Sequence, residues 1–140
     1  MSKNLKSAIA HPKVVVEKIS KEVKAGRVAG PFKYPPIPNL RISPLGLVPK
    51  KGATDFRLIH HLSYPPNASV NDYIDPKFCH VKYTQFDEAI KLVQDLGQGC
   101  LLGKSDIKSA FRLIPVAPED FDQLGFCYDK KVYFGSSILI

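Results

Sequence analysis

A single carboxylate, Asp106, stands in the stretch of this sequence whose residue types most readily support chemistry. Residues 100–102 form an apolar run typical of a buried strand, and Asp106 falls where that strand should end. A short turn of small residues follows, and then an aromatic residue, Phe111. A carboxylate beside exposed backbone N–H groups and an aromatic ring suits a metal ion together with a phosphate group. The alternative is a surface aspartate that caps a turn.

Three cations lie near the turn of a predicted β-hairpin over residues 45–60. The β-prone segments LGLV and FRLIH flank the turn sequence KKGATD. Lys50 and Lys51 begin the turn, and Arg57 lies on the returning strand, close to both lysines if the strands pair. Lysine supplies a mobile point charge and arginine a forked donor, a combination suited to a triphosphate. The alternative is a set of edge-strand lysines that discourage aggregation.

His60 and His61 follow directly and raise the question of a metal site. Adjacent side chains on a strand point to opposite faces, so these two rings would not share one ion. We therefore expect both histidines to pack structurally.

Composition and charge narrow the class of partner. The chain has 140 residues, enough for one domain with a real core or for a piece of a larger one. Lys and Arg number 20 against 13 Asp and Glu, and the net charge of +7 favours polyanions such as nucleic acid or nucleotides. Cys79, Cys100 and Cys127 form no CxxC pair, so we expect reduced, partly buried thiols in an intracellular protein. No apolar run approaches the length of a membrane span, and the N-terminus lacks the apolar core of a secretory signal.

The N-terminal third divides into three predicted segments. Residues 1–11 are polar and are expected to be disordered. Apolar residues then recur at helical spacing after Pro12, which predicts an amphipathic helix over residues 13–25, with a membrane-surface helix as the alternative. Half of the twelve prolines lie in residues 31–49, which excludes a helix or a central strand there. This stretch should run extended across a surface, with a flexible linker as the alternative.

The C-terminal half carries three further predicted elements. Residues 84–97 form an amphipathic helix capped by Thr84 and Asp87, with an apolar face expected to pack in the core. PEDFDQ at residues 118–123 predicts one or two helical turns. LGFCY and KVYF, joined by residues 129–131, predict a closing hairpin.

Two long blocks together resemble a known family. SPLGLVPKKGATDFRLIHHLSYPPNASVND at 43–72 and LGKSDIKSAFRLIPVAPEDFDQLGF at 102–126 resemble the N-terminal part of a retrotransposon reverse transcriptase, nearest the tyrosine-recombinase-bearing (DIRS-type) branch. The resemblance covers roughly residues 12–134. It implies an α+β fold, the fingers and incomplete palm of a right-hand DNA/RNA polymerase. A fingers-like subdomain would span residues 12–99 and the start of the palm residues 100–140.

The resemblance implies a role for each matching residue after the predicted strand. Asp106 matches the motif A aspartate that bridges two catalytic Mg²⁺ ions, and Ile107 adds its backbone carbonyl to the metal. Ser109 and Ala110 offer backbone N–H groups to the nucleotide phosphates. Phe111 matches the steric gate that rejects a ribose 2′-hydroxyl.

The predicted hairpin matches the part of the fingers that holds the incoming nucleotide. Arg57 and one of Lys50 or Lys51 would bind the triphosphate, and the spacing from Arg57 slightly favours Lys50. The implied activity is RNA-directed DNA polymerisation, a nucleotidyl transfer that uses Mg²⁺, a template-primer of RNA or DNA, and deoxynucleotides.

The chain departs from the family in ways that bear on activity. Two-metal chemistry needs at least two carboxylates, and the family's paired aspartates occur nowhere in this sequence. The family's next motif, a proline-glycine loop, is also missing, and KVYF runs directly into GSSILI. We therefore expect a fragment that is inactive alone, either because a partner chain supplies the missing palm segment in trans or because the gene model is truncated. The alternatives are a non-catalytic basic nucleic-acid-binding module and an unstable transposon remnant.

Overall fold

A computed structural model describes residues 3–50, 52, 55–107 and 110–137 of the chain. The chain divides into two compact units, Met1–Tyr73 with Ser109–Ile140, and Ile74–Lys108. Helices and strands are both present, which confirms the predicted α+β class at this coarse level. The expected boundary between polymerase subdomains at residues 99 and 100 stays a prediction.

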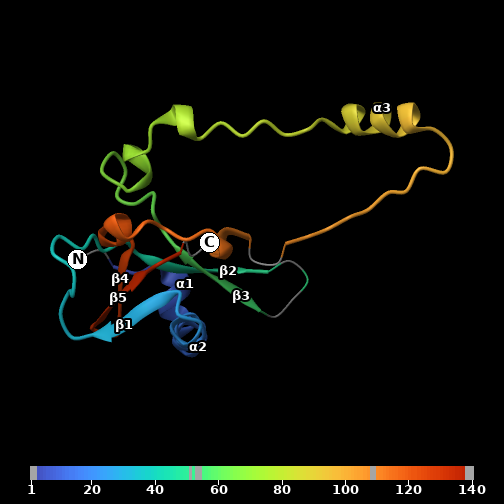
Figure 1. The fold of residues 1–140 in the computed structure, drawn as a ribbon. Helices are drawn as coiled ribbons and strands as arrows, with labels where there is room; N and C mark the ends of the chain where they lie inside the picture. The colour runs from blue at the N-terminus through green and yellow to red at the C-terminus, as the bar shows by residue number, and fades with distance from the viewer. Residues whose placement is uncertain (1–2, 51, 53–54, 108–109, 138–140) are drawn as a thin grey trace. The chain divides into compact units, whose positions relative to one another are not determined.

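The first unit is built on two antiparallel sheets (Figure 1). The three-stranded sheet has the order β1-β5-β4, with β1 at Val28–Phe32, β4 at Gly125–Tyr128 and β5 at Lys131–Gly135. The two-stranded sheet pairs β2, Leu45–Pro49, with β3, Phe56–His60. Both predicted hairpins are confirmed. The turn between β4 and β5 places Asp129 and Lys130 at φ of 47° and 57°, as a tight two-residue hairpin requires.

The first part of the Pro-rich stretch joins a sheet, and residues 33–39 then pass through bends and turns, so the expected extended course is only partly seen. Pro31 lies in β1, which is an edge strand and therefore tolerates a residue without a backbone N–H. Gly125 in β4 marks a close approach of this stretch, because a Cβ there would lie 2.6 Å from the Arg41 carbonyl oxygen. The Gly125 carbonyl accepts a hydrogen bond from the Ser43 N–H at 2.9 Å.

Two helices pack against these sheets (Figure 1). The predicted helix is confirmed as α2, Pro12–Lys24, which lies against β1 and β3. A shorter helix, α1, spans Lys6–Ala10 and lies against β2. The core collects buried apolar residues from both helices and from β1 to β4: Ala8, Val15, Ile19, Val28, Leu45, Leu47, Leu58 and Phe126.

The N-terminal segment differs from the expected disorder of residues 1–11. The Asn4 side chain accepts a hydrogen bond from the Leu45 N–H at 2.9 Å, and the Ser7 hydroxyl accepts one from the Leu47 N–H at 3.0 Å. These bonds pair the segment with the free edge of β2, which satisfies backbone groups that would otherwise lack partners. Because the partners lie some forty positions away, local composition does not reveal them.

Four short 3₁₀ helices complete the described elements. They are η1 at Asn71–Tyr73, η2 at Pro76–Phe78, η3 at Ala110–Leu113 and η4 at Pro118–Gln123. The last confirms the predicted helical turns at residues 118–123.

The second unit contains η2 and one longer helix, α3, at Phe86–Leu96. The helix is confirmed and ends at Gly97 as expected, with φ of 79°. Its predicted cap is wrong: Gln85 is the N-cap, and the Glu88 carboxylate accepts a hydrogen bond from the Gln85 N–H at 3.1 Å. Within its own unit α3 leaves the apolar residues Phe86 and Leu96 mostly exposed, and the expected core packing of this face stays a prediction.

The strand predicted over residues 100–102 is not formed. Residues 97–107 have no strand, and Leu101 is 98% exposed. A strand needs a hydrogen-bonded neighbour, and no described residue pairs with this run. A run of apolar residues favours a strand, but the strand forms only where a second strand supplies the hydrogen bonds.

Removal of the Leu58 side chain tests the core. Leu58→Ala deletes a 1%-exposed side chain and should lower the free energy of unfolding by about 2–5 kcal/mol. Val48→Ala on the paired strand is the control, because Val48 is 43% exposed and should cost within about 0.5 kcal/mol. Urea unfolding of both variants measures the difference. Equal losses would contradict this placement of the core.

Candidate functional site

The β2–β3 hairpin carries two of the predicted triphosphate ligands on one face. Val48 pairs with Arg57 in the ladder, and the Lys50 N–H donates to the Asp55 carbonyl at 2.9 Å, which extends the pairing by one register. Side chains alternate along a strand, and cross-strand partners share a face. Lys50 and Arg57 are therefore diagonal neighbours on the face opposite Leu58, whose side chain enters the core.

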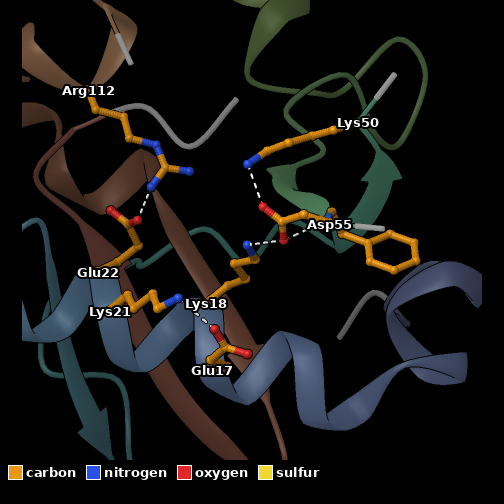
Figure 2. Close-up of polar contacts among 8 residues, drawn as sticks. Glu17, Lys18, Lys21, Glu22, Lys50, Asp55 and Arg112 are labelled. Carbon is orange, nitrogen blue, oxygen red and sulfur yellow. Dashed lines mark hydrogen bonds and ion pairs between the residues drawn. The ribbon is translucent and has the colours of Figure 1, made fainter. Parts of the chain in front are cut away.

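Asp55 lies between two lysines at the end of this hairpin (Figure 2). Its Oδ1 is 2.5 Å from the Lys18 Nζ, and its Oδ2 is 2.5 Å from the Lys50 Nζ. The Phe56 N–H also donates to Oδ1 at 2.8 Å. The hydrogen bonds from Lys18, then Lys50, then the Phe56 backbone hold the pKa of the Asp55 carboxyl well below its usual range. This carboxylate is therefore a permanent anion at neutral pH.

Arg57 presents its guanidinium to solvent. The residue is exposed, and among the residues that the structure describes no side chain pairs with it. Lys50, by contrast, is held by Asp55. The hairpin face thus combines one unengaged cation with one that an internal anion already engages.

Glu22 of α2 is a buried carboxylate held by two arginines. Its Oε2 accepts a hydrogen bond from the Arg27 Nε at 2.8 Å. Its Oε1 accepts a hydrogen bond from Arg112 in η3, as Figure 2 shows. Burial lowers the pKa of the Arg112 guanidinium. Because a buried charge needs a partner, this cluster fastens η3 to α2.

The residues predicted to contact the nucleotide after Asp106 lie in η3. Ala110 and Phe111 are both exposed, and Phe111 is 58% exposed. They directly precede Arg112, so the Glu22 cluster fixes the backbone that carries them. The other members of the predicted set, Lys51 and Ser109, lie outside the described residues.

Asp106 and Ile107 belong to the second unit, whereas the hairpin and η3 belong to the first. Both residues are exposed and lie outside helices and strands. Across residues 3–50, 52, 55–107 and 110–137, no three His, Cys, Asp or Glu side chains gather closely enough to hold a metal ion. Binding of Mg²⁺ at Asp106 stays a prediction, and we derive no chemical step through the metal.

Sequence reasoning did not identify three residues of this site: Lys18, Glu22 and Asp55. Lys18 and Glu22 belong to the charged residues that separate the apolar positions of α2, and no local pattern distinguishes them from its other charges. Asp55 had one readable signal, because it closes the turn opposite Lys50. A cross-strand pair of opposite charge is a recognised stabilising arrangement.

His60 is a structural histidine, as predicted. It is buried in β3, its Nε2 donates to the Gly125 carbonyl at 3.0 Å, and its ring lies edge-on to Phe126 at 5.5 Å between centroids. Burial lowers the pKa of His60 from 6.5 to about 4, and the hydrogen bond to Gly125 offsets only part of that effect. The neutral ring therefore helps to join the two sheets.

No model of a protein family and no curated protein matches this sequence. Of the helices that the structure describes, none combines the length and the apolar character needed to cross a membrane. The resemblance of residues 43–72 and 102–126 to reverse transcriptases stays a hypothesis.

The free energy of unfolding should fall as the pH falls from 6.5 towards 4. In that window the unfolded chain protonates His60 while the folded chain does not, so the unfolded state gains protons and stability is lost. The pKa difference corresponds to a loss of about 3 kcal/mol, which levels off below pH 4. Urea unfolding of the native chain and of His60→Gln across this range measures the loss.

The difference between the two curves isolates His60, because the carboxylates are common to both proteins. His60→Gln should show a shallower decline than the native chain. Parallel pH curves for the two proteins would contradict a neutral, buried His60.

Proposed function

We propose that this chain carries the fingers and the start of the palm of a retrotransposon reverse transcriptase, and that its hairpin binds a deoxynucleoside triphosphate. The observation that carries the proposal is the register of β2 and β3. The pairings of Val48 with Arg57 and of Lys50 with Asp55 put a lysine and an arginine on one solvent-facing side of the hairpin. A point charge and a bidentate fork at neighbouring positions suit successive phosphates.

The remaining members of the proposed nucleotide pocket follow from the resemblance. Ala110 and Ser109 would offer backbone N–H groups to phosphate, and Phe111 would lie against the sugar as the steric gate. The exposure of Phe111 supports this role, because a ring used as a gate must be accessible to the ligand. Asp106 and the Ile107 carbonyl would be the metal ligands of the complete family site.

We propose nucleotide binding for this chain without nucleotidyl transfer by the chain alone. The sequence holds no adjacent pair of aspartates, and one carboxylate cannot bridge and orient two Mg²⁺ ions. The second candidate function is a basic nucleic-acid-binding module without catalysis, which the net charge of +7 supports.

Arg57→Ala should weaken binding of dATP by on the order of tenfold, because charge-assisted hydrogen bonds to phosphate are worth about 1.5–3 kcal/mol. Isothermal titration with Mg²⁺ and dATP at about 0.15 M salt measures the effect. Lys131→Ala is the control, because Lys131 is an exposed cation on a different hairpin and carries the same charge. Equal affinities of Arg57→Ala and the native chain would refute the hairpin as a nucleotide site.

The same titration separates the two candidate functions. A nucleic-acid-binding module should bind a single-stranded oligonucleotide with an affinity that falls steeply as salt rises, because phosphate contacts release counterions. It should show no Arg57-dependent affinity for dATP. That combination of results would favour the second candidate over the first.

Primer extension by the purified 140-residue chain should be absent. A labelled primer on an RNA or DNA template, incubated with Mg²⁺ and all four deoxynucleotides, measures this. Asp106→Asn is the matched control, because it removes the one predicted metal-bridging carboxylate without changing side-chain size. Templated extension that Asp106→Asn abolishes would show that the catalytic set is complete in this chain.

A further inference from the structure

Lys18 of α2 is the less exposed of the two lysines that hold Asp55. The side chain of Lys18 is 18% exposed, against 41% for Lys50 and 44% for Asp55. Lys18 lies on α2 between the buried positions Val15 and Ile19 in the sequence, and its amine reaches Asp55 at the hairpin end. Packing therefore fixes the position of one ammonium group, while the carboxylate that it holds is accessible to solvent.

The two lysines form an anion-binding arrangement that the Asp55 carboxylate of the same chain occupies. Two ammonium groups, from α2 and from the hairpin, each lie 2.5 Å from a different oxygen of one carboxylate (Figure 2). A phosphate group also presents two or more oxygens to convergent donors. Arg57 lies one step along the same face and is exposed. The group therefore has three cations and one anion.

We infer that Lys18 is a third polyphosphate-binding cation of the hairpin site, and that Asp55 is a competing internal anion which a polyphosphate displaces from Lys50. The inference rests on the proposed function for its ligand, the triphosphate of a nucleotide. It adds a residue from α2 to the predicted triphosphate-binding cations, which all lie on the hairpin. It also gives Asp55 a role in selecting the ligand.

Competition with Asp55 selects for ligands of high charge. The low pKa of the Asp55 carboxyl keeps it ionised, so any anion that enters must overcome its repulsion and release its hold on Lys50. A monophosphate can replace the Asp55 carboxylate on the two lysines, but it makes few interactions that the carboxylate does not already make. A chain of phosphates can also contact Arg57, so its advantage grows with length. Repulsion of the wrong ligand is a general route to specificity.

Titration with inorganic tripolyphosphate tests the inference on the full chain. Asp55→Asn should bind tripolyphosphate on the order of tenfold more tightly, because repulsion is removed and both lysines are released. In that background, Lys18→Met should return the affinity to the native value or below. Lys18→Met alone should weaken binding several-fold, which keeps the inference testable if Asp55→Asn folds poorly. Thermal unfolding of each variant establishes that it is folded.

The neighbouring exposed pair on α2 supplies matched controls. Glu17 and Lys21 form an ion pair at 2.6 Å with both side chains more than half exposed (Figure 2). Glu17→Gln makes the same charge change as Asp55→Asn and also releases a lysine, and Lys21→Met matches Lys18→Met. Both controls should change the affinity less than twofold. An Asp55→Asn affinity no tighter than that of Glu17→Gln, or a Lys18→Met affinity equal to that of Lys21→Met, overturns the inference.

Failure of the inference is distinguishable from failure of the proposed function. If Arg57→Ala weakens dATP binding but Asp55→Asn does not tighten tripolyphosphate binding, the nucleotide site stands and the role of Asp55 and Lys18 is refuted. If Asp55→Asn and Lys18→Met act as expected on tripolyphosphate but dATP does not bind, the anion site stands and the nucleotide function is refuted.

Discussion

The buried carboxylate of Glu22 is the constraint on which the arrangement of the first unit depends. A charge removed from water is tolerated only when it is paired, and removing one partner of such a pair is strongly destabilising. Arg27 lies just before β1, and Arg112 lies in η3, ninety positions from Glu22. One helix, one strand and one distant 3₁₀ turn must therefore meet at a single point. The exposed residues of η3 owe their backbone position to that meeting.

Helix α2 contacts the core, the arginine cluster and the hairpin, because residues three to four positions apart lie on one side of a helix. Val15 and Ile19 enter the core, Glu22 enters the arginine cluster one turn later, and Lys18 reaches the hairpin from the edge of the buried face. Residues at i, i+3, i+4 and i+7 share one side of a helix, which accounts for the proximity of these roles. Core packing and site electrostatics are thus coupled through α2.

The sequence predicted what depends on near neighbours and missed what depends on distant ones. The β2–β3 hairpin is set by KKGATD and its flanking segments, so the register of Lys50 and Arg57 was accessible. Residues 3–10 are held by hydrogen bonds to the edge of β2, and the Glu22 cluster needs Arg112. Both contacts are with distant residues, so the local sequence does not predict them. The strand predicted over residues 100–102 is not formed, because a strand also needs a hydrogen-bonded partner, which the local sequence does not provide.

This division explains why the sequence identified the cations of the candidate site but not its anion. Lys50 and Arg57 are recognisable because their types and spacing match a ligand. Asp55 is of the wrong sign for that ligand, and its meaning depends on the amine of Lys18, which tertiary packing alone delivers. A search of the sequence for residues that attract an anionic ligand does not pick out a residue that repels it. In the site that we propose, this repulsive residue would make the hairpin favour a highly charged chain of phosphates over other anions.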